Sequence, residues 1–173
     1  MKRKIQASEL SKTYLVRTIT EADISTVYEL CSHNPIYYHY CPPFVTKELV
    51  LEDMIALPPG KTSEDKYYVG FYEKNCLVAV MDLIAGYPKE ACVWIGFFMM
   101  NKEFQGKGIG TAIITEACNY LSEVGFEKVQ LGYIKGNSQS ETFWLKNKFQ
   151  KTGRETLKPE YTIVVMERLL TQK

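Results

Sequence analysis

Gln105-Gly106-Lys107-Gly108-Ile109-Gly110 is the stretch of sequence that decides the fold. It stands between an apolar run, Val93 to Met100, and an amphipathic run, Thr111 to Val124. The pattern predicts a strand, a glycine-rich turn and a helix. Backbone N–H groups that no side chain crowds converge at such a helix N-terminus, where the helix dipole also favours anions. The sequence therefore indicates a turn that is able to hold a phosphate group.

Three interpretations of this turn compete. A tight turn without a ligand is the simplest, because glycines commonly gather in turns. A P-loop is excluded, since the chain has no G-x-x-x-x-G-K-[ST] stretch. A dinucleotide-binding fingerprint is disfavoured, because the spacing is G-x-G-x-G and Gln130 stands where an acid would be needed to hold a ribose.

The composition is that of an ordinary soluble globule. With 173 residues, 46% hydrophobic and 24% charged, the chain (1–173) is expected to form one domain with a substantial core. A net charge of +1 provides no field for nucleic acid or for a membrane surface. None of the five cysteines forms a C-x-x-C pair, so we expect reduced thiols and no metal site. Without a signal peptide or an apolar run of membrane-spanning length, the expected location is cytoplasmic.

Hydrophobic periodicity predicts the order βααβββαβαββ. The expected strands cover 14–20, 67–72, 76–85, 91–100, 128–134, 149–156 and 161–169. The expected helices begin at 20, cover 46–57 and 111–124, and begin again at 137. The segment 33–44 contains three prolines and is expected to interrupt regular structure.

Single residues mark the expected ends of several elements. Thr46 is placed to cap a helix, and Gly125 is placed to end one in the left-handed conformation. Asn75 is expected to take a positive φ in the turn between two strands. Ser138 and Glu141 fit a capping box.

A second motif narrows the interpretation of the glycine turn. The turn resembles the [RQ]-x-x-G-x-[GA] signature of the GNAT superfamily of N-acetyltransferases, and the segment Asn137 to Phe149 resembles that family's N-x-x-[AS]-x-x-x-[YW]-x-K-x-G-F. The predicted order of elements also follows the family from about Tyr14 to Leu169. The resemblance implies an α+β fold, with a mixed, mostly antiparallel central sheet flanked by helices.

The resemblance also implies a reaction. Family members bind acetyl-CoA or another acyl-CoA and transfer the acyl group to a primary amine, so the expected partner is a small-molecule amine or a protein amine, and the expected state is a monomer or a homodimer. Carried over position by position, the residues that would bind the acyl-CoA are Phe98, Met99, Met100, Gln105, Gly106, Lys107, Gly108, Ile109, Gly110, Thr111, Asn137, Ser140 and Trp144.

Several of these residues would have distinct roles. The strand through Phe98, Met99 and Met100 would pair its edge with the pantetheine arm, and the backbone N–H of Met100 would stabilise the oxyanion. These side chains are equally suited to a plain core. Asn137 would contact the pantetheine arm through its amide, although a helix cap explains it as well. Lys107 would add a positive charge, or would simply be solvated.

The chain departs from the family pattern in three places. Trp144 stands where many members carry the tyrosine that protonates the leaving thiolate, and an indole cannot release its proton usefully. Tyr133 or water would have to replace it. The position of the general-base glutamate in some members falls near Cys92, and Glu90 is the nearest acid, although an exposed turn acid explains Glu90 better. Lys148 replaces a glycine, so that either Lys148 or Asn147 is expected in the left-handed conformation.

The acceptor pocket would lie at the connection between the first two helices. Tyr37, Tyr38 and Tyr40 give this segment an aromatic lining that suits a flat or cationic acceptor, unless the rings only pack the segment onto the core. Asp82 on a neighbouring strand is expected to be an edge-facing acid rather than an amine ligand. A CoA-binding sensor or a catalytically weak relative is the alternative function, motivated by Trp144.

Overall fold

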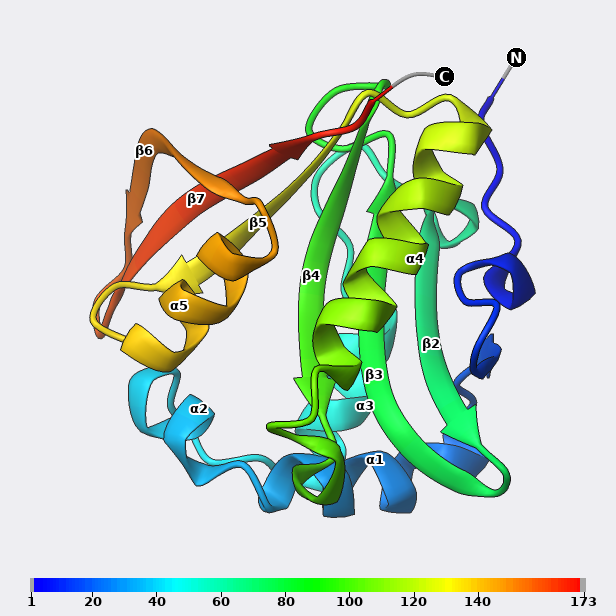
Figure 1. Cartoon of the computed structure of the whole chain (residues 1–173). Coiled ribbons are helices and arrows are strands. Elements are labelled where there is room, and N and C mark those ends of the chain that lie inside the picture. Colours follow the sequence, from blue (N-terminus) through cyan, green and yellow to red (C-terminus); the bar gives the residue numbers. More distant parts are fainter. Residues whose placement is uncertain (1, 172–173) are drawn as a thin grey trace.

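A seven-stranded sheet with the strand order β1-β2-β3-β4-β5-β7-β6 forms the centre of the molecule (Figure 1). The structure is a computed structural model and describes residues 2–171. Neighbouring strands are antiparallel except β4 and β5, which are parallel, so the predicted mixed, mostly antiparallel sheet is confirmed. The strands are β1 (Leu15–Thr18), β2 (Lys66–Glu73), β3 (Cys76–Ala85), β4 (Cys92–Met100), β5 (Lys128–Ile134), β6 (Gln150–Leu157) and β7 (Thr162–Leu169).

Helices cover both faces of this sheet. They are α1 (Ile24–Ser32), α2 (Pro35–Tyr40), α3 (Lys47–Ile55), α4 (Ile109–Val124) and α5 (Ser138–Lys146), with short 3-10 turns η1 (Ala7–Glu9), η2 (Glu21–Asp23), η3 (Ser63–Asp65) and η4 (Lys102–Phe104). No helix in the described residues is long and apolar enough to cross a membrane.

The two faces of β3 show how the core is divided. Ala79 and Met81 are fully buried in a cluster with the apolar stripe of α4, whereas Val80 is buried in a second cluster with α1 and α3. Successive side chains of a strand point to opposite faces, so a strand that is buried on both sides needs apolar residues throughout. The apolar run of β3 therefore explains its place near the middle of the sheet.

The parallel pair β4–β5 separates partway along its length. In the described residues the pairing extends from Cys92↔Lys128 to Ile95↔Leu131 and then ends, while β4 continues to Met100 alongside β3. The register between β3 and β4 shifts between Asp82 and Leu83, where the pairing skips Gly96 of β4. The second half of β4 is thus paired on one side only, and β5 diverges from it toward β7 (Figure 1).

Several expected ends of elements are confirmed. Thr46 Oγ1 accepts a hydrogen bond from the Leu49 N–H at 3.1 Å, which is the expected N-cap of α3. Gly125 ends α4 with φ +98°. Lys148, with φ +67°, takes the left-handed position for which Asn147 was the alternative.

Other local expectations are wrong. The segment 33–44 contains the short helix α2, because Pro35 stands at the first helical turn, where no N–H is needed. Lys74, not Asn75, has the positive φ in the β2–β3 turn. The helix α5 is capped by Asn137, whose side chain accepts from the Ser140 N–H at 3.2 Å, so Ser138 is not the cap.

Candidate acyl-donor site

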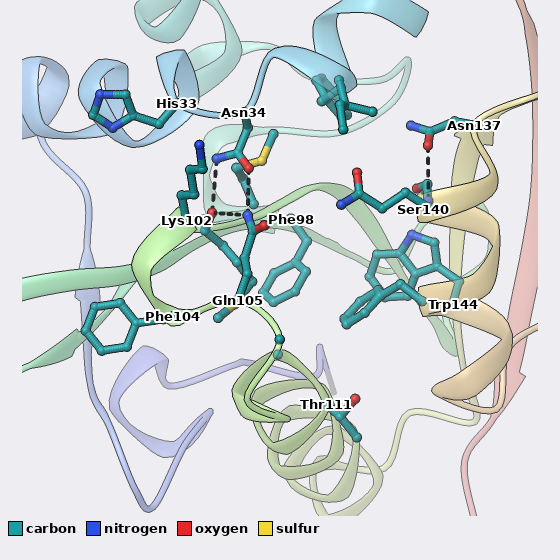
Figure 2. Close-up of a pocket in the computed structure, with 18 of the residues that line it drawn as sticks. His33, Asn34, Phe98, Lys102, Phe104, Gln105, Thr111, Asn137, Ser140 and Trp144 are labelled. Atoms are coloured by element: carbon teal, nitrogen blue, oxygen red, sulfur yellow. Dashed lines mark hydrogen bonds between the residues drawn. The ribbon is translucent and has the colours of Figure 1, made fainter.

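A cavity of about 490 Å³ lies where β4 parts from β5. The second half of β4, the glycine turn, α5 and the start of α2 surround it (Figure 2). It brings together most of the residues that the sequence predicts: Tyr37, Phe98, Met99, Met100, Gln105, Gly106, Gly108, Gly110, Thr111, Asn137, Ser140 and Trp144.

The backbone of Met100 faces the open side of β4. The N–H of Asn101 donates to the Val78 carbonyl of β3 at 2.8 Å. Because backbone groups alternate in direction along a strand, the N–H and the C=O of Met100 point away from β3. The carbonyl confirms this direction, since it accepts hydrogen bonds from Asn34 Nδ2 and Gln105 Nε2, each at 3.1 Å. The Met100 N–H therefore points toward the side from which β5 has diverged.

Asn34 joins α1, β4 and the glycine turn. Its Nδ2 also donates to the Leu30 carbonyl at 2.9 Å, and its Oδ1 accepts from Gln105 Nε2 at 2.6 Å (Figure 2). These contacts fix the end of β4 against the start of α2. The sequence interpretation did not include Asn34, because its partners are up to 71 positions away in the chain and it shows no local motif.

The glycine turn presents unused N–H groups to the same cavity. Gly106 and Gly108 have φ of +73° and +76°, and a Cβ added to either would have no atom within 4 Å. The first helical bond of α4 runs from the Ala112 N–H to the Gly108 carbonyl at 3.0 Å. The N–H groups of 109–111 precede that bond and therefore lack a helical acceptor, as at any helix N-terminus. Positive φ, open space and free donors together fit a phosphate group.

Gly110 has a different reason to be glycine. A Cβ at this position would lie 3.1 Å from Phe143 Cε2, so its absence lets α4 approach α5 closely. The neighbouring rings form an aromatic wall. Phe98 stacks on Phe143 with centroids 5.8 Å apart, and Trp144 contacts Phe143 at 4.9 Å and Phe149 at 5.1 Å. Trp144 is buried in this wall, which accounts for an indole at that position by packing.

Asn137 caps α5, which is the alternative that the sequence analysis gave to a contact with the pantetheine arm. Its Oδ1 is used in the cap, the residue is 4% exposed, and its Nδ2 has no hydrogen-bond partner within residues 2–171. A donor is therefore left over on the wall of the cavity. Other wall residues were missing from the predicted site: His33, Asn34, Pro35, Ile36, Lys102, Phe104, Gln139, Phe143 and Lys146.

Some predicted site residues lie away from this cavity. Glu90 is exposed in the turn before β4, at the opposite end of that strand from Met100. Tyr133 is buried in β5, where burial raises the pKa of its hydroxyl and Glu141 and Lys151 are its charged neighbours. Lys107 is exposed, with its Nζ 5.9 Å from the centre of the Phe104 ring.

Ile109 and two of the three tyrosines also fall outside the cavity wall. Ile109 packs against the core that α4 shares with the sheet. The ring of Tyr38 packs against Tyr37 and Phe44 at 4.9 and 5.3 Å, and the ring of Tyr40 packs against His39 at 5.1 Å. Only Tyr37 of the three tyrosines reaches the cavity.

The expectation for Asp82 is wrong. Asp82 does not face an edge, because β3 lies inside the sheet between β2 and β4. It is 8% exposed and forms a salt bridge with Lys66 Nζ at 2.9 Å. No group of three or more His, Cys, Asp or Glu in the described residues is arranged to hold a metal ion.

Comparison with known proteins gives a consistent result. The structure resembles an acetyltransferase of Thermus thermophilus, with TM-score 0.73, 17% identity, and coverage of 91% of this chain and 97% of that one. It also resembles the PaiA N-acetyltransferase of Thermoplasma acidophilum in complex with coenzyme A, with TM-score 0.65, 17% identity, and coverage of 90% and 98%. A third is the phosphinothricin acetyltransferase of Sinorhizobium meliloti in complex with AcCoA, with TM-score 0.63, 18% identity, and coverage of 91% and 89%.

The search of curated protein sequences finds no match. Residues 29–149, however, match the acetyltransferase (GNAT) family, and this range contains the open edge of β4, the glycine turn and α5. With the fold and the sequence in agreement, the chain belongs to the acetyltransferase (GNAT) family.

Proposed function

We propose that this protein transfers an acetyl group from acetyl-CoA to a primary amine by direct attack of the amine on the thioester. One observation carries the proposal: the unpaired edge of β4 and the N–H groups of the glycine turn border the same cavity. Two of the similar solved structures contain coenzyme A or AcCoA, which supports this choice of donor.

The residues of the cavity fit acetyl-CoA. The pantetheine arm carries amides, and the open edge of β4 offers backbone groups for them at Phe98 and Met100. The pyrophosphate is an anion, and the free N–H groups at the start of α4 offer donors together with the positive end of the helix dipole. Lys102 and Lys146 on the wall add positive charge. When bound, acetyl-CoA supplies the acyl group in the activated form of a thioester.

The protein's own contribution at the reacting carbonyl is a fixed hydrogen-bond donor. The Met100 N–H would donate to the carbonyl oxygen as negative charge develops on it, and a donor held in place before the reaction stabilises that charge most effectively. Asn34 and Gln105 hold the Met100 carbonyl, which points away from β3 as this N–H does. We assign them as positioning residues.

The proton acceptor is sought among the side chains that line the cavity. None of these lining side chains is a carboxylate. Burial strongly raises the pKa of Tyr37, which makes its hydroxyl a hydrogen-bond donor rather than a source of phenolate. His33, which is exposed at the edge of the cavity, is the proton acceptor that we propose, because histidine is the side chain used most often for this task.

Two measurements test the proposal. Calorimetry with acetyl-CoA and with CoA should show binding well below the millimolar range, and weaker binding would contradict the donor assignment. Release of the CoA thiol should then follow the addition of a suitable primary amine from a panel. Binding without thiol release for every amine would instead favour the non-catalytic, sensor-like interpretation.

A further inference from the structure

A second cavity, of about 330 Å³, lies between β3 and β4 on one side and the segment from α2 to α3 on the other. We call it the Asp82 cavity. Its wall includes Tyr37, Tyr38, Asp53, Asp82, Gly96 and Phe97. The ring of Tyr37 borders both this cavity and the acyl-donor cavity. The Asp82 cavity therefore adjoins the proposed reaction site.

Asp82 lacks one of the hydrogen bonds that a buried carboxylate needs. Its Oδ2 is paired with Lys66 Nζ at 2.9 Å, and the same Nζ also donates to the Ala56 carbonyl at 2.8 Å. Its Oδ1 is buried and accepts no hydrogen bond within residues 2–171. Asp82 lines the cavity, and a buried carboxylate oxygen without a hydrogen bond is a strong acceptor that lacks a donor.

The charges around this cavity do not balance. Asp53 lines the same cavity from α3, is exposed at its mouth, and forms no ion pair with any described residue. Lys66 is the one cation that pairs with either acid in the part of the chain that the structure describes, so two carboxylates face one ammonium group. Burial raises the pKa of Asp82 to about 6 even with Lys66 beside it, so the attraction of Lys66 does not offset the cost of burying this carboxylate. A second cation would balance the charge of the two carboxylates.

The remaining walls suit an organic cation. Tyr37, Tyr38 and Phe97 present aromatic rings, whose faces attract ammonium groups. Gly96 keeps the acid accessible, because a Cβ at that position would lie 2.5 Å from Asp82 Oδ2. The combination of an unsatisfied acceptor, excess negative charge and aromatic rings points to an alkylammonium group.

We propose that the Asp82 cavity binds an ammonium group of the acceptor, and that the acceptor is therefore an amine carrying a second positive charge. The proposal rests on the proposed function, since it names the acceptor of that reaction. Asp82 lies in register with Phe97, three residues before Met100. At the usual rise of a strand this separates the two positions by roughly 10 Å, so an extended α,ω-diamine of about that length fits best.

Direct binding provides the first test. Calorimetry on the CoA-saturated protein would compare α,ω-diaminooctane with octylamine, which has the same chain and one charge. We expect the diamine to bind at least about tenfold more tightly, the ratio for one charge-assisted hydrogen bond. Equal affinities, or no binding of either amine, would overturn the proposal. The shorter α,ω-diaminobutane should show a smaller advantage over butylamine, and an equal one would refute the spacing.

Variants separate the subsite from the fold. Asp53→Asn, at the exposed mouth, should reduce the ratio of diamine to octylamine affinity, while Glu52→Gln, an exposed neighbour outside the cavity, should leave the ratio unchanged. Gly96→Ala, whose Cβ would crowd Asp82, should reduce the ratio as well. A ratio unaffected by Asp53→Asn and Gly96→Ala, in variants that fold, would contradict the proposal.

Turnover separates this inference from the proposed function. The same diamine preference in kcat/KM for thiol release would support both. A diamine preference in binding without thiol release would contradict the proposed function and leave the cation site supported. Thiol release with equal kcat/KM for octylamine and the diamine would support the transferase and refute the cation site.

Discussion

Replacing Gly108 with alanine tests whether the glycine turn holds the phosphates of the donor. Gly108 has φ +76°, a conformation that costs an L-residue about 1–2 kcal/mol, and its added Cβ would meet no atom within 4 Å. Gly60 offers a matched control, with φ +78° and the same open surroundings, outside the cavity. Both alanine variants should therefore lose the same amount, about 1–2 kcal/mol of unfolding free energy, or roughly 2–8 °C in Tm.

The two variants should differ in binding. The Cβ of the Gly108→Ala variant enters the space where the N–H groups of the turn face the cavity, so CoA affinity measured by calorimetry should fall about tenfold or more, as when one charge-assisted hydrogen bond is lost. Gly60→Ala should bind CoA like the unmodified protein. Unchanged affinity in a folded Gly108→Ala variant would refute the assignment of the turn. An equal loss in both variants would show that backbone strain, not the site, is responsible.

Three further outcomes are expected. Asn34→Ala removes three side-chain hydrogen bonds, so the free energy of unfolding, measured with denaturant, should fall by about 1–3 kcal/mol. The variant should also lower kcat for thiol release more than it raises KM, and a change in KM alone would contradict the positioning role. Trp144→Ala should lower the free energy of unfolding by about 3–5 kcal/mol because the ring is buried. Trp144→Phe should keep the pH profile of thiol release, and a shifted profile would show that the indole takes part in proton transfer. Burial raises the pKa of Asp82 from 3.8 to about 6, with Lys66 and Asp53 as its charged neighbours. The protonated carboxyl therefore stabilises the folded state fully below pH 3.8, and this stabilisation is lost as the pH rises through 6. The loss in the free energy of unfolding is at most about 3 kcal/mol. Unfolding curves at several pH values, with Asp82→Asn as the reference, should show this difference, and parallel pH profiles would contradict it.

The regular elements and the donor half of the site could be predicted because their signals are local. The apolar run of β4, the glycines of the turn and the stripe of α4 are adjacent in sequence, and each follows from periodicity or from glycine's freedom at positive φ. The motif around Asn137 and Trp144 placed α5 against the same cavity, where the structure also has it. Packing then decided what the motif left open: Trp144 belongs to an aromatic wall, and Lys148 takes the left-handed position.

The rest depends on contacts between distant parts of the chain. Asn34 matters because α1 meets β4 and the turn, and Asp82 pairs with Lys66, which lies 16 positions earlier on another strand. The direction of the Met100 backbone follows from its pairing with β3 and from the divergence of β5, which no local pattern encodes. Residue type and position in sequence favour Tyr133 and Glu90 as proton-transfer groups, but neither residue lines the cavity.

The separation of β4 from β5 also bears on solubility. An unpaired strand edge on the outside of a sheet invites pairing with another chain and so promotes aggregation. Here the unpaired edge belongs to a strand in the middle of the sheet (Figure 1). The cavity beside it is lined by residues of the start of α4 and of α5. A thin, flexible molecule can reach it, but a second polypeptide strand with its neighbours cannot align along it. The unpaired edge of β4 thus differs from the two outer edges of the sheet, β1 and β6, where no neighbouring strand of the sheet flanks a pairing partner.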